Sequence, residues 1–200
     1  MKQAERREAS RQAIVAAARQ LFGGDGFAAT TVDQVAAAAS LAKGAVYHHF
    51  PGKEALFEAV FEAACADVAG QVREVAAQAP DILEAMAAGA AAYFDACSDG
   101  EFRQIILKDG PAVLGWERWR QIDAEHFGRM APVVLATAMD LGLIARQPVE
   151  PLARLLLGAM TEAAAACAAS EAPRRTGAEH VAAFRTILEG LRSKRDEAGV

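Results

Sequence analysis

The stretch from Thr31 to Lys53, TVDQVAAAASLAKGAVYHHFPGK, constrains the fold of this chain more than any other segment. Thr31 and Gln34 have the spacing of a capping box, which predicts a short helix beginning after Thr31. Ser40 and Leu41 are predicted to form a turn, and a second short helix should follow over residues 42–50. Two short helices around a tight turn are typical of a helix-turn-helix, whose second helix lies against DNA.

A helix is also predicted before this pair, over residues 10–22. Ser10 is a suitable cap for it, and Gly23, Gly24 and Gly26 follow its last turn. The apolar stripe at helical spacing consists of Ile14, Ala17, Ala18, Leu21 and Phe22. The three helices together predict a DNA-binding head over residues 9–55.

The remaining sequence predicts an all-α body over residues 56–195. Alanine dominates, β-branched residues are sparse, and strand periodicity is absent from the sequence. Gly110 and Pro111 are expected to break the chain, and Pro132 to kink a helix. The helices expected before the last two cover residues 53–78, 82–98, 102–108 and 116–141. The ends, residues 2–8 and 193–200, are expected to be frayed.

The last two helices are predicted to form a homodimer interface, with a purely internal core as the alternative. The final helix has an apolar repeat with the spacing of a coiled-coil seam, made of Val181, Phe184, Leu188 and Leu191. The helix before it has a side suited to close packing, made of Gly158, Ala159, Glu162, Ala166 and Ala169. Because a reader of one DNA half-site needs a second copy, the dimer is favoured.

Charge is divided unevenly along the chain, whose net charge is −5. Residues 1–53 contain seven basic and four acidic residues, whereas the rest contains 14 basic and 22 acidic residues. A basic head attracts phosphate, and an acidic body repels it. The sequence predicts no secretory signal and no membrane span, and hence a cytoplasmic protein. Cys65, Cys97 and Cys167 are expected to be buried thiols, and no metal or cofactor is expected.

Seven residues are predicted to contact DNA. Lys43 and Lys53 suit phosphate, as does the hydroxyl of Thr31, although solvation and helix capping are the plainer alternatives. The Tyr47 hydroxyl suits phosphate as well, and His48 suits a guanine edge in the major groove. The full set is Thr31, Lys43, Gly44, Ala45, Tyr47, His48 and Lys53.

A ligand pocket is predicted in the body from large side chains on its middle helices. Most such residues belong to a plain core, but two tryptophans three residues apart, with polar groups on the next turns, also suit an apolar cavity. The predicted ligand contacts are Phe94, Phe102, Trp116, Trp119, Asp123 and His126.

The helix-turn-helix resembles that of the TetR family of transcriptional regulators. The matching residues are Thr30-Thr31-Val32, Val35-Ala36, Lys43 to Phe50, and Lys53-Glu54. Two body segments, residues 109–116 and 157–163, are also similar to one TetR subgroup. The resemblance implies an all-α homodimer whose heads bind palindromic DNA, and whose bodies bind a small, largely apolar effector that releases the DNA.

The chain departs from the family pattern at three positions. Ser40 stands where Gly is usual, and Ser is less tolerant of a left-handed backbone. Ala42 and Ala45 replace frequent hydroxyl residues, so they offer no cap and no polar contact. We expect the head to fold but to bind the DNA backbone more weakly than is usual in the family.

Two other function classes compete with a regulator. A helical-bundle enzyme lacks support because the sequence has no GxSxG, no HExxH and no paired Glu-x-x-His motif. An architectural DNA binder without sequence preference is disfavoured by the acidic body, and a steep salt dependence without sequence discrimination would favour it.

Overall fold

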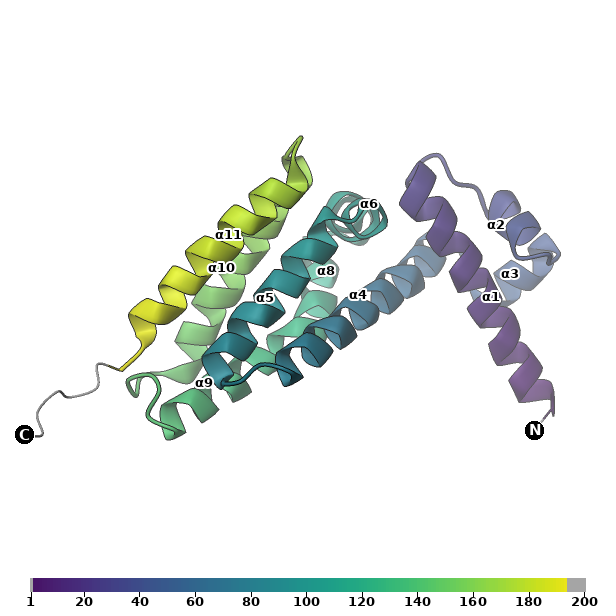
Figure 1. Ribbon diagram of the computed structural model, residues 1–200. Helices are drawn as coiled ribbons and strands as arrows, with labels where there is room; N and C mark the ends of the chain where they lie inside the picture. The colour runs from purple at the N-terminus through teal and green to yellow at the C-terminus, as the bar shows by residue number, and fades with distance from the viewer. Residues whose placement is uncertain (1, 194–200) are drawn as a thin grey trace, which may run out of the picture. The chain divides into compact units, whose positions relative to one another are not determined.

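The computed structural model describes residues 2–193, and these are helical apart from short connections (Figure 1). No strand is assigned within this range, and one isolated bridge pairs Ile144 with Arg192. The predicted all-α class is confirmed. The elements are α1 (Lys2–Asp25), α2 (Val32–Ala38), α3 (Lys43–His49), α4 (Lys53–Ala77), α5 (Ile82–Ser98), α6 (Gly100–Phe102), η1 (Arg103–Asp109), α7 (Gly110–Leu114), α8 (Trp116–Asp123), η2 (Ala124–Gly128), α9 (Met130–Asp140), α10 (Val149–Ala169) and α11 (Pro173–Leu191).

The contacts divide the chain into two compact units. The first combines the residues up to Asp67 with Asp99–Ile122, and the second combines Val68–Ser98 with the residues from Asp123 onward. The head therefore shares its unit with the start of α4 and with the segment from α6 to α8. Helix α4 contributes residues to both units.

An aromatic cluster forms the centre of the first unit. The ring of Phe57 on α4 meets Phe22 of α1 and Phe27 of the following loop edge-on, with centroids 5.3 and 5.2 Å apart. Phe22, Phe57 and Phe61 are fully buried, as are Ile14 and Val35. Burial of aromatic surface dominates the energetics of small cores, so this cluster holds α1, α2 and α4 together.

Helix α1 is longer than the sequence predicted. It begins at Lys2, so the expectation that residues 2–8 are frayed is wrong, whereas residues 194–200 lie outside the described range. Ser10 is not a cap, because it lies inside the helix and its hydroxyl donates to the carbonyl of Arg6. The acidic, basic and polar residues of the first two turns suit an exposed helix better than a frayed end.

The predicted break at Gly110-Pro111 is also wrong. Gly110 opens α7 with Pro111 in its first turn, where a missing N–H is tolerated. A Cβ at Gly110 would lie 2.7 Å from the Phe61 ring and 2.9 Å from the Trp119 ring, so close packing explains this glycine. The chain instead turns at Gly115, whose φ is +77°.

The predicted helix over residues 116–141 is divided in the structure. Helix α8 passes into the π-helical turn η2, and α9 begins at Met130, so the interruption precedes Pro132 by a full turn. Gly142, with a φ of +68°, follows the end of α9, which lies one residue short of the predicted end at residue 141. The predicted helices ending at Gln78 and Ser98 agree with α4 and α5 to within one residue.

The second unit is a bundle in which α11 packs along α5 and α10 (Figure 1). Phe184 and Leu188 are buried within this unit, so the predicted coiled-coil seam of α11 faces its own bundle rather than a partner. Helix α10 is long and apolar enough to cross a membrane by length and composition alone, but it carries Arg154 and Glu162 and packs here as a bundle helix.

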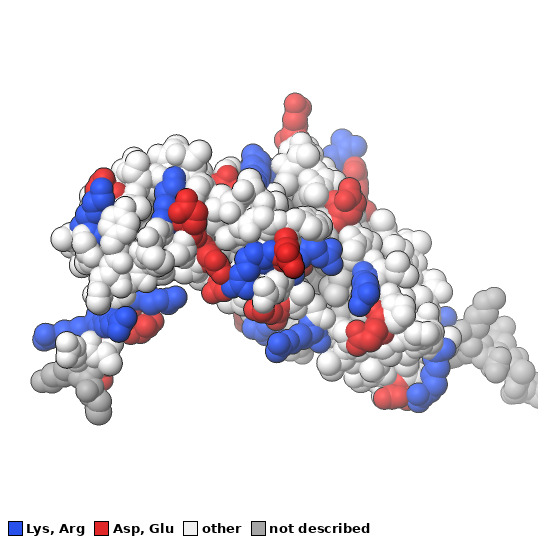
Figure 2. Space-filling view, turned by 180° about the vertical axis from the view of Figure 1, so that it is seen from behind, with Lys and Arg blue, Asp and Glu red and all other residues white. Residues whose placement is uncertain are grey.

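Charged side chains are mixed over the face that Figure 2 presents, with basic and acidic groups close together. The uneven charge of the sequence therefore does not produce a single one-signed field on that face. Ion pairs inside the first unit also bring opposite charges together, since Arg118 contacts both Glu58 and Glu62.

Candidate DNA-binding surface and ligand cavity

The helix-turn-helix has the local geometry that its sequence predicts. Thr31 and Gln34 form a complete capping box, with the Gln34 N–H 3.2 Å from the Thr31 hydroxyl and the Thr31 N–H 2.7 Å from the Gln34 side chain. Ser40 adopts a φ of +56°, the left-handed conformation that glycine favours. Ala42 is the N-cap of α3 and makes no side-chain cap hydrogen bond.

Helix α3 buries one side and exposes the other. Val46 and Phe50 anchor it in the head, whereas the side chains of Lys43, Tyr47 and His48 are exposed. Tyr47 is 48% exposed, which is unusual for a large aromatic residue that only fills a core. The position of a Cβ at Gly44 has no neighbour within 4 Å, and Ala45 is half-buried beside it. The structure thus leaves this face of α3 open.

The two predicted phosphate lysines have different surroundings. Lys43 pairs with Asp33 at 2.9 Å on the surface, and this hydrogen bond raises the pKa of Lys43. The Lys53 ammonium donates to the carbonyls of Phe27 and Thr30 at 2.9 and 3.0 Å and lies 4.0 Å from the centre of the Phe27 ring. Because an ammonium has three donors, Lys53 holds the loop before α2 with two of them and retains one.

Cationic groups from α1 lie next to the end of α3. The Arg11 guanidinium lies over the Phe50 ring at 5.6 Å. Burial lowers the pKa of His49, and the charges of His48, Arg7 and Arg11 lower it further. Arg7 and Arg11 therefore belong to the same neighbourhood as the two histidines. The sequence predicted a frayed end over residues 2–8 because the apolar periodicity of α1 is weak over its first turns.

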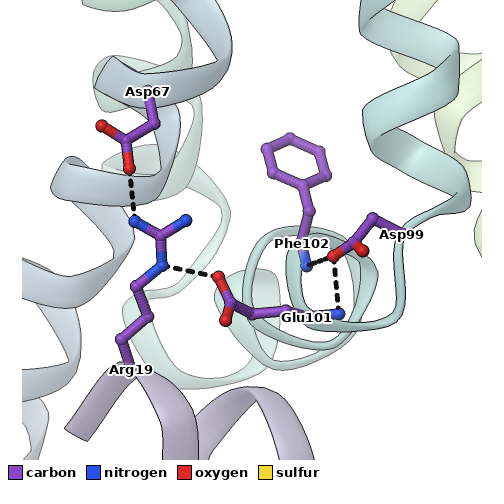
Figure 3. Close-up of polar contacts among 5 residues, drawn as sticks. All are labelled: Arg19, Asp67, Asp99, Glu101 and Phe102. Atoms are coloured by element: carbon purple, nitrogen blue, oxygen red, sulfur yellow. Dashed lines mark hydrogen bonds and ion pairs between the residues drawn. The ribbon is translucent and has the colours of Figure 1, made fainter. Parts of the chain in front are cut away.

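Helix α1 is linked to the segment after α5 by a partly exposed ion cluster (Figure 3). Arg19 contacts Asp67 of α4 and Glu101 of α6, and Asp99 caps α6 through the N–H groups of Glu101 and Phe102. Burial alone would lower the pKa of Arg19, but the hydrogen bonds with both carboxylates outweigh it and raise the pKa. Asp109 adds a second link by accepting the Phe27 N–H at 2.8 Å.

A cavity of about 560 Å³ lies within the second unit. This volume is typical of sites for small organic molecules. Its wall comes from α4, α5, α8, η2, α9, α10 and α11 and is largely apolar. The lining residues are Val72, Arg73, Ala76, Ala77, Ala85, Met86, Gly89, Ala90, Tyr93, Asp123, Phe127, Arg129, Met130, Ala131, Val133, Val134, Leu156, Leu157, Met160, Thr161 and Phe184.

Only one of the predicted ligand residues, Asp123, lines this cavity. Phe102 and Trp119 are buried in the first unit, where the Trp119 indole N–H donates to the carbonyl of Ile106 at 2.9 Å. Trp116 is exposed and stacks on Trp119, and His126 is half-buried outside the lining. Helical spacing placed Trp116, Trp119 and Asp123 together on one helix, but the contacts assign α8 up to Ile122 to the first unit and Asp123 to the second.

Phe94 contributes to a smaller pocket between α5 and α11. This pocket has a volume of about 290 Å³ and includes Asp95, Ser98 and Arg174. The cavity residues that the sequence did not single out, Met160 and Phe184 among them, looked like ordinary core positions. Only the convergence of seven elements around one cavity distinguishes them.

All three cysteines are buried thiols that form no disulfide, as predicted. Burial raises the pKa of Cys97 and of Cys167, which disfavours the reactive thiolate at both positions. Among the described residues, no group of three or more His, Cys, Asp or Glu side chains is arranged to hold a metal ion.

Two known sequence families match this chain. Residues 14–60 match the bacterial regulatory proteins of the tetR family, and residues 83–191 match the tetracyclin repressor-like C-terminal domain. The repressor KstR2 of Rhodococcus jostii is 32% identical over 92 residues, which cover 46% of this chain and 45% of KstR2. The chain thus spans less than half the length of that relative.

Solved structures extend the likeness over almost the whole chain. A TetR-family transcriptional regulator from Pectobacterium atrosepticum is 30% identical, with a TM-score of 0.84 over 95% of this chain and 97% of that chain. The fatty acid degradation regulator FadR from Bacillus halodurans is 16% identical, with a TM-score of 0.73 over 90% and 97% of the two chains, and so shares the fold. With a helix-turn-helix head, a helical body and both family matches, this chain belongs to the TetR family of transcriptional regulators.

Proposed function

We propose that this protein is a transcriptional repressor that binds a palindromic operator as a homodimer and is released by a small, largely apolar ligand. The observation that supports it most is the open face of α3, where Lys43, Tyr47 and His48 are exposed on a helix that Val46 and Phe50 anchor in the head. A helix of this kind enters the major groove with its exposed side chains toward the base edges.

The seven DNA-contact residues divide by role in this proposal. Thr31, Lys43, Tyr47 and the third donor of Lys53 bind phosphate oxygens, which positions the head without reading sequence. His48 reads a base edge, while Gly44 and Ala45 allow the backbone of α3 to approach the groove. The DNA-binding domain covers residues 9–55, and the ligand-binding and dimerisation domain begins at residue 56.

The homodimer forms through exposed faces of α10 and α11. Leu155 on α10 is 72% exposed and Ile187 on α11 is 46% exposed. Gly158, Ala159 and Ala166 are exposed on α10, so two copies of this helix can approach closely. The interface uses this outer face, because Phe184 and Leu188 are already buried in the protomer.

The ligand site is the cavity of the second unit. Helix α4 lines it with Val72 and Ala76 and begins at Lys53 beside the helix-turn-helix. Because α4 begins in the head, a ligand that displaces the other end of α4 also shifts the helix-turn-helix. The protein works by binding alone, in the cytoplasm, without a catalytic residue, metal or cofactor.

Selection from a random duplex library by the purified protein at near-physiological salt tests the proposal. We expect recovery of a palindrome whose half-sites lie about one helical turn apart. Recovery of an asymmetric sequence would contradict the dimer, and recovery of no preferred sequence from ligand-stripped, folded protein would contradict a sequence-specific regulator. The Tyr47→Ala variant is the control, since it should bind poorly to every duplex.

A further inference from the structure

The cavity of the second unit has an uneven distribution of polar groups. Most of its wall is apolar, and three of the protein's five methionines, Met86, Met130 and Met160, contribute to it. Methionine is unbranched and flexible, so a wall rich in it adapts to a flexible chain more readily than to one rigid outline. The interior therefore suits an aliphatic part of a ligand.

Two guanidinium groups also line this cavity. Arg73 comes from α4 and Arg129 precedes α9, and both side chains are exposed, which places them at the open edge of the cavity. Neither arginine forms an ion pair with a carboxylate of residues 2–193. Several other arginines of the protein, including Arg19, Arg118, Arg146, Arg175 and Arg185, do form such pairs. The cavity mouth thus carries cationic groups without an internal counter-charge.

The remaining polar groups of the lining do not reverse this balance. Asp123 is its one carboxylate, against two arginines, so the lining carries a net positive charge. The Thr161 hydroxyl donates to the carbonyl of Leu157 within its own helix. The Tyr93 hydroxyl is engaged with the Cys97 thiol, so Tyr93 presents its ring rather than its polar end.

We propose that the ligand is an anionic amphiphile: a flexible aliphatic chain held among the methionines, with one carboxylate or comparable anion bound by Arg73 and Arg129. Arginine binds such anions through paired hydrogen bonds, and an anion is the group that an unpaired guanidinium at an apolar mouth lacks. This inference rests on the proposed function, since it names the ligand of the same cavity.

Three probes of equal chain length test the sign of the head group. Decanoate, 1-decanol and decylamine are titrated into the full-length protein, and binding is followed by calorimetry in the absence of DNA. We expect decanoate to bind roughly tenfold more tightly than decanol, and decylamine to bind more weakly than either. Equal binding of decanoate and decanol, tighter binding of decylamine, or no binding of any probe would overturn the proposal.

Arginine variants localise the effect. Arg73→Gln and Arg129→Gln should each remove most of the preference for decanoate while leaving decanol binding unchanged. Arg175→Gln is the matched control, because Arg175 is exposed on α11 and lies outside the cavity. Retention of the decanoate preference in both cavity variants would contradict the assigned head-group site.

Addition of the probes to the protein bound to its selected duplex separates this inference from the proposed function. Release by decanol as effectively as by decanoate would overturn the ligand class and leave the repressor intact. Failure to select any duplex would overturn the repressor, while the DNA-free titrations would still decide the ligand class.

Discussion

The exposed face of α3 and the cavity of the second unit are built in opposite ways. The α3 face takes its side chains from one seven-residue helix, and its polar groups point outward, away from the buried Val46. The cavity takes its side chains from seven elements, and residues such as Tyr93, Leu156 and Phe184 are at once lining and core. Function at α3 is therefore separable from folding, whereas function at the cavity is not.

This difference has a consequence for how each region can vary. Exposed residues of α3 can be exchanged at little cost in stability, so a different operator requires only local changes. A change in the cavity alters packing between helices, so a different ligand requires compensation elsewhere in the bundle.

Truncating one side chain of the cavity and one of the α3 face should give the largest difference in the free energy of unfolding. Phe184→Ala removes a buried ring, and we expect a loss of about 3 kcal/mol in the free energy of unfolding, near the lower end of such truncations because the ring already borders a cavity. Tyr47→Ala should change that free energy by less than about 0.5 kcal/mol. Denaturant unfolding of both variants checks this, and similar losses would erase the distinction between the two regions.

Loss of His48, the side chain that we propose reads a base, should affect DNA sequence specificity rather than protein stability. We expect His48→Ala to lower discrimination at one base pair of each half-site by about 1–3 kcal/mol, with little change in binding to unrelated DNA. Tyr47→Phe, which removes only a phosphate-directed hydroxyl, should weaken binding to all duplexes alike. Competition assays with single-base variants of the selected duplex measure both, and an unchanged preference in His48→Ala would assign base reading elsewhere.

The two lysines of the head should differ in their effect on stability. Lys53→Met leaves the carbonyls of Phe27 and Thr30 without their donor, so we expect a loss of about 1–2 kcal/mol in the free energy of unfolding. Lys43→Met breaks only a surface pair with Asp33 and should leave the unfolding curve in place. Equal unfolding curves for the two variants would show that the Lys53 ammonium does not stabilise the fold and is available for DNA binding alone.

Restoring the usual glycine in the turn should stabilise the head modestly. Ser40 has a φ of +56°, so Ser40→Gly relieves a left-handed backbone and should raise the free energy of unfolding by about 0.5–1 kcal/mol. Thermal unfolding measures the gain. Ala39→Gly is the control at a right-handed position, where glycine should destabilise instead.

His49 of the head should give the stability of the protein a small dependence on pH. The pKa of His49 is lower in the folded protein than its ordinary value of 6.5, so the unfolded chain binds the proton more readily. Stability should therefore decrease as the pH falls through about 6.5, and His49→Gln should reduce this decrease. Unfolding curves between pH 5.5 and 7.5 test it, and a steeper decrease in the variant would contradict the assignment.

The head was largely predictable from the sequence because its determinants are local. The capping box of Thr31 and Gln34, the left-handed Ser40 and the uncapped Ala42 all act within a few residues and appear in the structure as expected. The cavity was not predictable in the same way. Trp116, Trp119 and Asp123 share the regular helix α8, but α8 up to Ile122 belongs to the first unit, whereas Asp123 lines the cavity of the second unit. Helical spacing does not show where one packing unit ends and the next begins.

The packing role of Gly110 was also not predictable from the sequence. Gly110 before a proline suggested a break, but its position against Phe61 and Trp119 depends on contacts between residues far apart in the chain. The sequence correctly predicted an apolar face on α11, and in the structure this face packs on α5 and α10 of the same protomer. Periodicity reveals that a face is buried without revealing what buries it.

The affinity of the protein for its selected palindrome and for a scrambled duplex of the same composition, both measured over a range of salt concentrations, tests the central claim most directly. A sequence-reading head predicts parallel salt dependences, because both complexes share the phosphate contacts, separated by a ratio of about 10³ or more in affinity. Coincident curves would identify a DNA binder without sequence preference and would contradict the assignment of α3 as a reader of base sequence.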